Sequence, residues 1–281
     1  MRFFFVSIAF QWLFISVAFT RPFSSVVQSF VAFADEAIND WNVPGLAFSI
    51  VTPEEDACLT KTYGIRKVGS EESIDKNTIF RIASLSKGFS AALSVKLAHR
   101  GVIALDHPII HYLPDVTIAN NSFTKDIRIK HILSHTTGVM RFCMEHEAYK
   151  RQPLGDIIKN LKYAQRIGQP GQCFQYQNVI FSLLALIIER ATGETFVKTM
   201  KKELLIPLGM DHTILTEAEY DELANMAHPH QWKEGRYCPL QTSSYYYNVL
   251  PAGGIASSIS DMSQWLKVLL GSNPAVLDEK T

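Results

Sequence analysis

The sequence predicts an α+β fold, because helix-like and strand-like segments follow one another in blocks. Apolar residues have helical spacing over residues 24–41, and two extended runs follow at 46–51 and 57–64. An amphipathic helix then begins near Ser84. From Gly101 onward, short helical segments alternate with polar and proline-containing breaks. A helix and a meander of strands therefore precede a mainly helical region.

The first 20 residues form a segment of their own. They carry one charge, Arg2, ahead of a mostly apolar run over residues 3–19, with small residues at 16–18. This pattern predicts a signal peptide. An uncleaved signal anchor is the alternative, because the run approaches the roughly 20 residues that span a bilayer. In both cases we expect residues 21–281 to be exported, periplasmic or secreted, with membrane attachment if the segment is retained.

Composition narrows the classes of partner. Lys plus Arg and Asp plus Glu number 27 each, and no basic cluster stands out, so nucleic acid is not an expected partner. The four cysteines are Cys58, Cys143, Cys173 and Cys238, without Cys-x-x-Cys spacing. In an oxidising compartment they can form up to two disulfides in any of three pairings, and the sequence leaves the choice open.

Ser84 and Lys87 are the first pair of residues that indicate chemistry. Three positions apart at the start of a predicted helix, they share one helix face. A lysine is unfavourable there by roughly 0.3–1 kcal/mol, since the helix N-terminus is already positive. The same field favours the neutral amine, which can take the proton of a nearby hydroxyl. The alternative is an ordinary N-cap serine beside a solvated lysine.

A second polar pair, Tyr176 and Asn178, precedes an almost wholly apolar run over residues 179–191, which predicts a fully buried helix. At the mouth of such a helix, a phenol can relay a proton and an amide can orient Lys87 and a substrate carbonyl. A packed tyrosine followed by an N-cap asparagine is the alternative.

Each pair has a competitor in the sequence. Ser122 and Lys125 repeat the Ser-x-x-Lys spacing, but in a polar run where no helix is expected. Tyr246 and Asn248 repeat Tyr-x-Asn without the preceding Pro-Gly turn. Context therefore favours Ser84, Lys87, Tyr176 and Asn178.

Two further segments carry weaker predictions. His131 and His135 have the i, i+4 spacing of a helical metal pair, but no third ligand is evident, so a structural role near the turn is expected instead. Close to the C-terminus, a helix that starts at Ser260 is expected to turn Met262, Trp265, Leu266 and Leu269 inward.

Several motifs occur in one order over about residues 30–270. They are Val43-Pro-Gly-Leu46, Thr78-Ile-Phe-Arg-Ile-Ala-Ser84-Leu-Ser-Lys87, Gly101-Val-Ile-Ala-Leu-Asp106, Tyr112-Leu-Pro114, Ile132-Leu-Ser-His-Thr-Thr-Gly138, Pro170-Gly171 with Tyr176-Gln-Asn178, Pro207-Leu-Gly-Met210 and Ala252-Gly-Gly-Ile-Ala-Ser257. In this set the sequence resembles the serine β-lactamase and penicillin-binding-protein superfamily. Tyr-x-Asn as the second motif resembles its class C-like branch, which also includes DD-peptidases and esterases.

The resemblance implies a three-layer fold, with an antiparallel sheet between helices and an inserted helical lobe, here at about residues 101–240. It implies that Ser84 is the acylated nucleophile, Lys87 its activating partner, Tyr176 the proton-transfer phenol and Asn178 the group that positions lysine and substrate. The implied substrate is a small molecule or a peptidoglycan-derived peptide: a β-lactam, a D-Ala-D-Ala peptide or an ester. No metal or organic cofactor is implied.

One departure from the family pattern concerns its third motif, Lys or His followed by Thr or Ser and Gly. None follows Tyr176 in this sequence. In such enzymes that strand supplies one oxyanion-hole N–H, and loss of one such donor costs about 10²–10³ in rate. A truncated domain that lacks its C-terminal strands is therefore expected. The alternative function is a catalytically impaired protein that binds penicillin or cell-wall peptide.

Overall fold

The computed structural model describes residues 23–52, 58–150, 152–241 and 243–277. The predicted signal segment at residues 1–20 lies outside these ranges. No helix in the described part is both long and apolar enough to span a bilayer. Three of the cysteines, Cys143, Cys173 and Cys238, are free thiols, and the side chain of Cys58 lies outside the described part.

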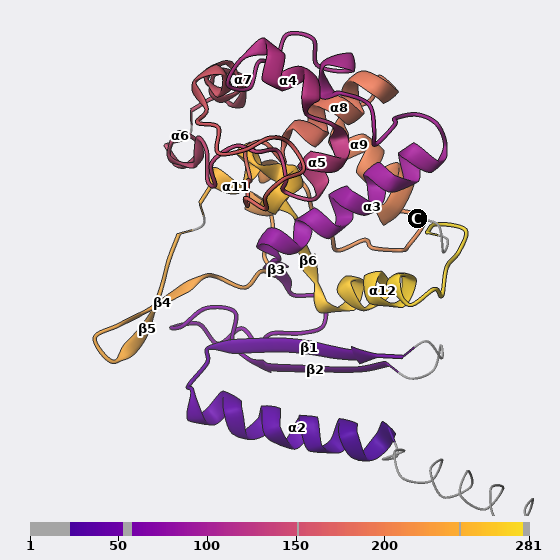
Figure 1. Cartoon of the computed structure of the whole chain (residues 1–281). Coiled ribbons are helices and arrows are strands. Elements are labelled where there is room, and N and C mark those ends of the chain that lie inside the picture. Colours follow the sequence, from indigo (N-terminus) through magenta and orange to yellow (C-terminus); the bar gives the residue numbers. More distant parts are fainter. Residues whose placement is uncertain (1–22, 53–57, 151, 242, 278–281) are drawn as a thin grey trace, which may run out of the picture.

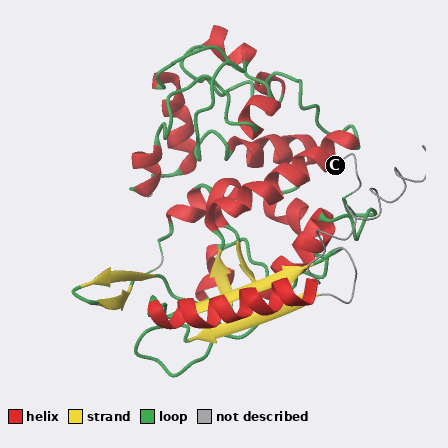
Figure 2. Ribbon diagram, turned by 60° about the horizontal axis from the view of Figure 1, so that its bottom comes forward, coloured by secondary structure: helices red, strands yellow, loops and turns green. Residues whose placement is uncertain are grey.

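The N-terminal region is a hairpin between two helices (Figure 1). Strands β1 (Gly45–Val51) and β2 (Cys58–Gly64) pair antiparallel, with Gly45 opposite Gly64. Helix α2 (Phe23–Asp40) runs across one side of this hairpin, and α12 (Ile259–Leu269) packs on the other (Figures 1 and 2). Strand segments here are separated in sequence from the helical region, and the predicted α+β class is confirmed.

Two more pairs of strands complete the sheet structure of the described residues. Strand β3 (Ile79–Arg81) pairs antiparallel with β6 (Ala256–Ser258), so the segment before Ser84 is held by a segment near the C-terminus. Strands β4 (His230–Lys233) and β5 (Arg236–Pro239) form a separate hairpin that projects from the body of the molecule (Figure 1). This hairpin lies within the predicted helical lobe, near its end.

Helices and turns make up most of the chain between β3 and β6. Helix α3 (Ser86–His99) and helix α8 (Leu183–Thr192) are the longest of those described there. The shorter elements are η1 (Ala83–Leu85), η2 (Ile109–His111), α4 (Asn121–Asp126), α5 (Ile129–Leu133), α6 (Glu145–Tyr149), α7 (Leu154–Asn160), η3 (Leu161–Tyr163), α9 (Phe196–Met200), η4 (Lys201–Leu205), α10 (Glu217–Asp221), α11 (Tyr245–Asn248) and η5 (Leu250–Gly254).

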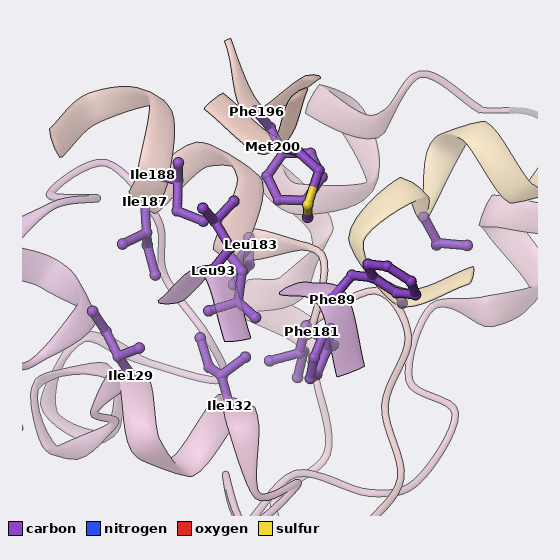
Figure 3. Close-up of a cluster of buried hydrophobic side chains, with 14 of the residues drawn as sticks. Phe89, Leu93, Ile129, Ile132, Phe181, Leu183, Ile187, Ile188, Phe196 and Met200 are labelled. Atoms are coloured by element: carbon purple, nitrogen blue, oxygen red, sulfur yellow. The ribbon is translucent and has the colours of Figure 1, made fainter. Parts of the chain in front are cut away.

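The main hydrophobic core lies around α3 and α8. Phe89 and Leu93 of α3 are fully buried, as the predicted apolar stripe requires, and they pack with Phe181, Leu183 and Ile187 (Figure 3). The ring of Phe89 also stacks on Trp265 of α12 at a centroid distance of 4.0 Å. Helix α3 is therefore anchored from two directions.

Two sequence predictions for helices need correction. The buried run at 179–191 becomes regular helix only at Leu183, because its first residues form turns, with the Ser182 N–H donating to the carbonyl of Asn178. In α12, Trp265 is buried, but Leu266 and Leu269 are 38% and 57% exposed. The inward prediction for those two leucines was wrong, because α12 contacts β1 and β6 along a narrower stripe that includes Val268.

Candidate active site

Ser84 lies in a strained turn between β3 and α3. The sequence predicts that the helix begins near Ser84, whereas in the structure Ser84 is the middle residue of η1 and α3 starts at Ser86. Ala83 has φ +45°, a left-handed conformation that costs an alanine on the order of 1 kcal/mol or more. The Ser86 hydroxyl donates to the Ala83 carbonyl at 2.6 Å and accepts from the Ile255 N–H at 3.1 Å, which stabilises the turn.

Lys87 lies one turn along and points back toward Ser84. Its Nζ donates to Asn178 Oδ1 at 2.7 Å, to the Ala252 carbonyl at 2.6 Å and to Ser84 Oγ at 3.4 Å. An ammonium has three N–H donors, so all three are used. When the amine loses a proton, the two shorter bonds keep their protons, and the lone pair is left facing the Ser84 hydroxyl.

Burial makes a neutral amine accessible at Lys87. Desolvation lowers the pKa of Lys87 to about 8, and the charge of Glu145 opposes this shift. The sequence predicts an effect of the helix N-terminus on this amine. The structure adds the effect of burial, which depends on which segments cover the side chain.

Tyr176 reaches Ser84 from the helical region. Its hydroxyl is 2.6 Å from Ser84 Oγ, within hydrogen-bond distance, and Lys87 Nζ lies 4.5 Å from the centre of its ring. The ring is also 4.5 Å from the ring of His135. Tyr176 is thus held between a cationic group and a buried imidazole, with its oxygen directed at Ser84.

His135 is a buried neutral residue in this arrangement. Burial and the nearby Lys87 charge lower the pKa of His135 to about 4. Its Nδ1 accepts from the Gln177 N–H at 3.2 Å, so the imidazole supports the segment that carries Tyr176 and Asn178. The described residues contain no group of three metal-ligating side chains. The contacts of His135 are those of a structural residue.

The competing motifs do not join this group of hydrogen-bonded side chains. Ser122 and Lys125 are on α4, a short helix where the sequence predicts none, capped by the Asn120 side chain. Asn248 donates to the carbonyls of Ala148 and Gln152, away from Ser84. The structure therefore joins Ser84, Lys87, Tyr176 and Asn178 by hydrogen bonds, and in the described part of the chain neither competing pair bonds to them.

Three groups around Lys87 escaped the sequence reasoning. The Ala252 carbonyl belongs to η5, within the motif at residues 252–257, which by itself predicts no contact with Lys87. Tyr245 accepts from Asn178 Nδ2 at 3.3 Å, and the Tyr245 hydroxyl donates to Glu145. No local sequence spacing predicts these contacts, because Glu145 and Tyr245 are 100 positions apart.

A cavity of about 440 Å³ reaches Ala83, the residue before Ser84. Its lining includes Ala83, Phe80 and Tyr246, together with the basic side chains of Arg66 and Arg81. A space of this size can hold part of a small molecule.

The fold and the site define a class of protein in which a lysine, one helical turn from a serine, and a tyrosine both contact the hydroxyl of that serine. The Beta-lactamase family model matches residues 26–281, and the chain belongs to this family. The resemblance to the serine β-lactamase and penicillin-binding-protein superfamily is confirmed at that level.

Similar proteins agree with this assignment. The structure of the octameric penicillin-binding protein homologue from Pyrococcus abyssi superposes with a TM-score of 0.76 at 25% identity, covering 90% of this chain and 58% of that one. The unguisins hydrolase ungD' of Aspergillus campestris is 27% identical over 89% of this chain and 48% of its own length. Protein flp of Staphylococcus aureus is 26% identical over 82% of this chain and 46% of its own. The chain spans about half the length of the curated relatives it matches.

Proposed function

We propose that the protein is a serine hydrolase that works through a covalent acyl-enzyme on Ser84. The observation that carries the proposal is the convergence of Lys87 Nζ and the Tyr176 hydroxyl on Ser84 Oγ, at 3.4 and 2.6 Å. Two groups able to move a proton at one hydroxyl are more than a capping serine requires. The hydrolase among the similar proteins supports the same reaction class.

The reaction follows from this geometry. The neutral Lys87 amine takes the Ser84 proton while Oγ forms a bond to the substrate's carbonyl carbon. The tetrahedral intermediate collapses with rupture of the bond to the leaving nitrogen or oxygen, which receives a proton through Tyr176. Water then adds to the ester on Ser84, and the acid product leaves as Oγ regains its proton. Asn178 holds the amine in place throughout, through its 2.7 Å contact.

The proposed substrates are those of the class C-like branch: a β-lactam, a D-Ala-D-Ala peptide or an ester. Tyr-x-Asn at Tyr176 and Asn178 supports this branch. The basic lining of the cavity at Arg66 and Arg81 is compatible with the carboxylate that the first two substrates carry. Export of the protein by its N-terminal segment, and contact with cell-wall peptide, are part of the same proposal.

The test is intact-mass measurement after incubation with benzylpenicillin, alongside turnover of nitrocefin and of p-nitrophenyl acetate. We expect an adduct or turnover in the wild type and neither in Ser84→Ala. Ser122→Ala, which removes the competing serine, is the matched control and should behave as wild type.

The outcomes separate the functions. Turnover supports a hydrolase, and the substrate that is turned over identifies the type. A lasting adduct on Ser84 without turnover indicates instead a penicillin-binding protein with impaired deacylation. Absence of both, or an adduct that persists in Ser84→Ala, contradicts the proposal.

A further inference from the structure

A buried acid lies behind the proposed site without a role in the reaction described above. Glu145, the first residue of α6, is only 9% exposed, and its Oε1 has no hydrogen-bond partner within the described part of the chain. A buried carboxylate is costly unless it is paired. Its other oxygen, Oε2, accepts the hydrogen bond of Tyr245 from α11.

The backbone is strained just before Glu145, whose side chain is buried. Phe142 has φ +55° and Met144 has φ +59°, both left-handed. Such conformations are rare for bulky residues and cost on the order of 1–3 kcal/mol each. The Glu145 N–H bonds to the carbonyl of Phe142 and closes the turn. The chain therefore accepts strain at two positions just before the buried acid.

A chain of hydrogen bonds connects Glu145 to Lys87, and the donor and acceptor roles along it are consistent. An ionised carboxylate only accepts, so the Tyr245 hydroxyl must donate to it. The Tyr245 oxygen is then free to accept, and it faces Asn178 Nδ2 at 3.3 Å. With its nitrogen committed to Tyr245, the Asn178 amide turns its oxygen to the Lys87 ammonium at 2.7 Å.

We propose that Glu145, acting through Tyr245, is a positioning residue that orients the Asn178 amide toward Lys87 and balances the buried Lys87 charge. This inference rests on the proposed function, because it concerns the amine that activates Ser84. Without the carboxylate, the Tyr245 proton can turn to Asn178, and the amide can reverse and present its nitrogen to the ammonium.

The other groups that face Lys87 do not supply this charge. His135 is neutral near pH 7, because its pKa is lowered to about 4. Tyr176 contacts Lys87 through its ring and Ser84 contacts it through its hydroxyl. Burial and the Glu145 hydrogen bond raise the pKa of the Tyr245 hydroxyl, so it stays protonated. Glu145 is the carboxylate whose charge acts on Lys87 and favours its protonated form.

The experiment compares Glu145→Gln and Tyr245→Phe with Glu147→Gln, which removes a carboxylate from the same helix outside this chain of hydrogen bonds. Competitive acetylation of Lys87 with acetic anhydride, followed by peptide mass spectrometry from about pH 6 to pH 10, reads the pKa of Lys87 directly. The rate of Ser84 acylation by p-nitrophenyl acetate is recorded over the same pH range. Thermal melts identify variants that remain folded.

We expect Glu145→Gln to lower the pKa of Lys87, so that acylation reaches half its maximum at a lower pH. Tyr245→Phe should lower the same pKa and reduce the maximal rate by about tenfold or more, since the amide is no longer held. The double variant should lose about as much acylation rate as the more severe single variant, because both changes interrupt the same chain of hydrogen bonds. Glu147→Gln should match wild type.

The inference is overturned if acetylation gives Glu145→Gln and Tyr245→Phe the same Lys87 pKa as Glu147→Gln. If Glu145→Gln does not fold, Tyr245→Phe, which keeps the carboxylate, decides alone. If the wild type shows no acylation of Ser84, the proposed function fails, and the acetylation profiles still decide whether Glu145 controls the charge of Lys87.

Discussion

The region around α3 and α8 and the outer layer of α2 with its hairpin are packed very differently. Phe89 and Leu93 on α3 have no exposed surface, and the site is built on this helix. In the outer layer, every residue of β1 is half-buried, and Phe33 of α2 is 65% exposed. The contrast indicates that Ser84 and Lys87 depend on the stability of the inner region, while the outer layer opens at lower free energy.

The largest expected effect comes from a comparison of two Phe→Ala substitutions, one in each region. Phe89→Ala removes a fully buried ring stacked on Trp265 and should lower the free energy of unfolding by about 3–5 kcal/mol. Phe33→Ala removes a ring that is mostly in solvent and should change it by about 0.5 kcal/mol or less. Urea unfolding followed by fluorescence measures both. Equal losses of unfolding free energy in the two variants would contradict the distinction between the two regions.

A smaller effect on stability is expected from substitutions at the two glycines that follow Ala252. A Cβ on Gly254 would lie 2.7 Å from the Tyr246 carbonyl oxygen, so Gly254→Ala must shift η5, at a cost of about 1–3 kcal/mol. Because Ala252 binds Lys87, acylation of Ser84 should also slow. Gly253→Ala is the matched control, since its Cβ would meet nothing closer than 3.6 Å. Identical melting temperatures and acylation rates for the two variants would contradict the packing argument.

The pH dependence of acylation sharpens the comparison at the site itself. Lys87 must be neutral to accept the Ser84 proton, and its pKa is lowered to about 8 by burial. Below that pH the neutral fraction falls about tenfold per pH unit, so acylation by p-nitrophenyl acetate should rise with pH and level off above about 8. Stopped-flow rates measure the profile. A plateau that begins only near the ordinary lysine value of 10.5 would mean that the inner region does not desolvate the amine.

The smallest expected effect concerns a hydrogen bond between α2 and the hairpin. The Tyr63 hydroxyl donates to Asp35 Oδ1 at 2.7 Å on an exposed surface, and this bond raises the pKa of Tyr63. Tyr63→Phe should cost less than about 1 kcal/mol, because water replaces the lost partner. The same urea experiment measures it. A loss of more than about 2 kcal/mol would show that the outer layer is as tightly coupled as the inner region.

The sequence alone determined much of this protein. The α+β class followed from the blocks of helical and extended spacing, and the ordered motifs indicated the family. Ser84 and Lys87 could be paired because positions three apart near a helix start are neighbours whatever the rest of the chain does. Tyr176 and Asn178 were selected by their context, a turn before and an apolar run after.

The tertiary structure decided what surrounds Lys87. Asn178 lies 91 positions from Lys87 and Ala252 lies 165 positions away, so their contacts depend on how distant segments pack. The same holds for Glu145 and Tyr245, which no sequence spacing connects to the site. Burial also lowers the Lys87 pKa, and burial is a property of the assembled fold. Local sequence sets which groups are adjacent along a helix, but the charge state of a buried amine is set by everything packed around it.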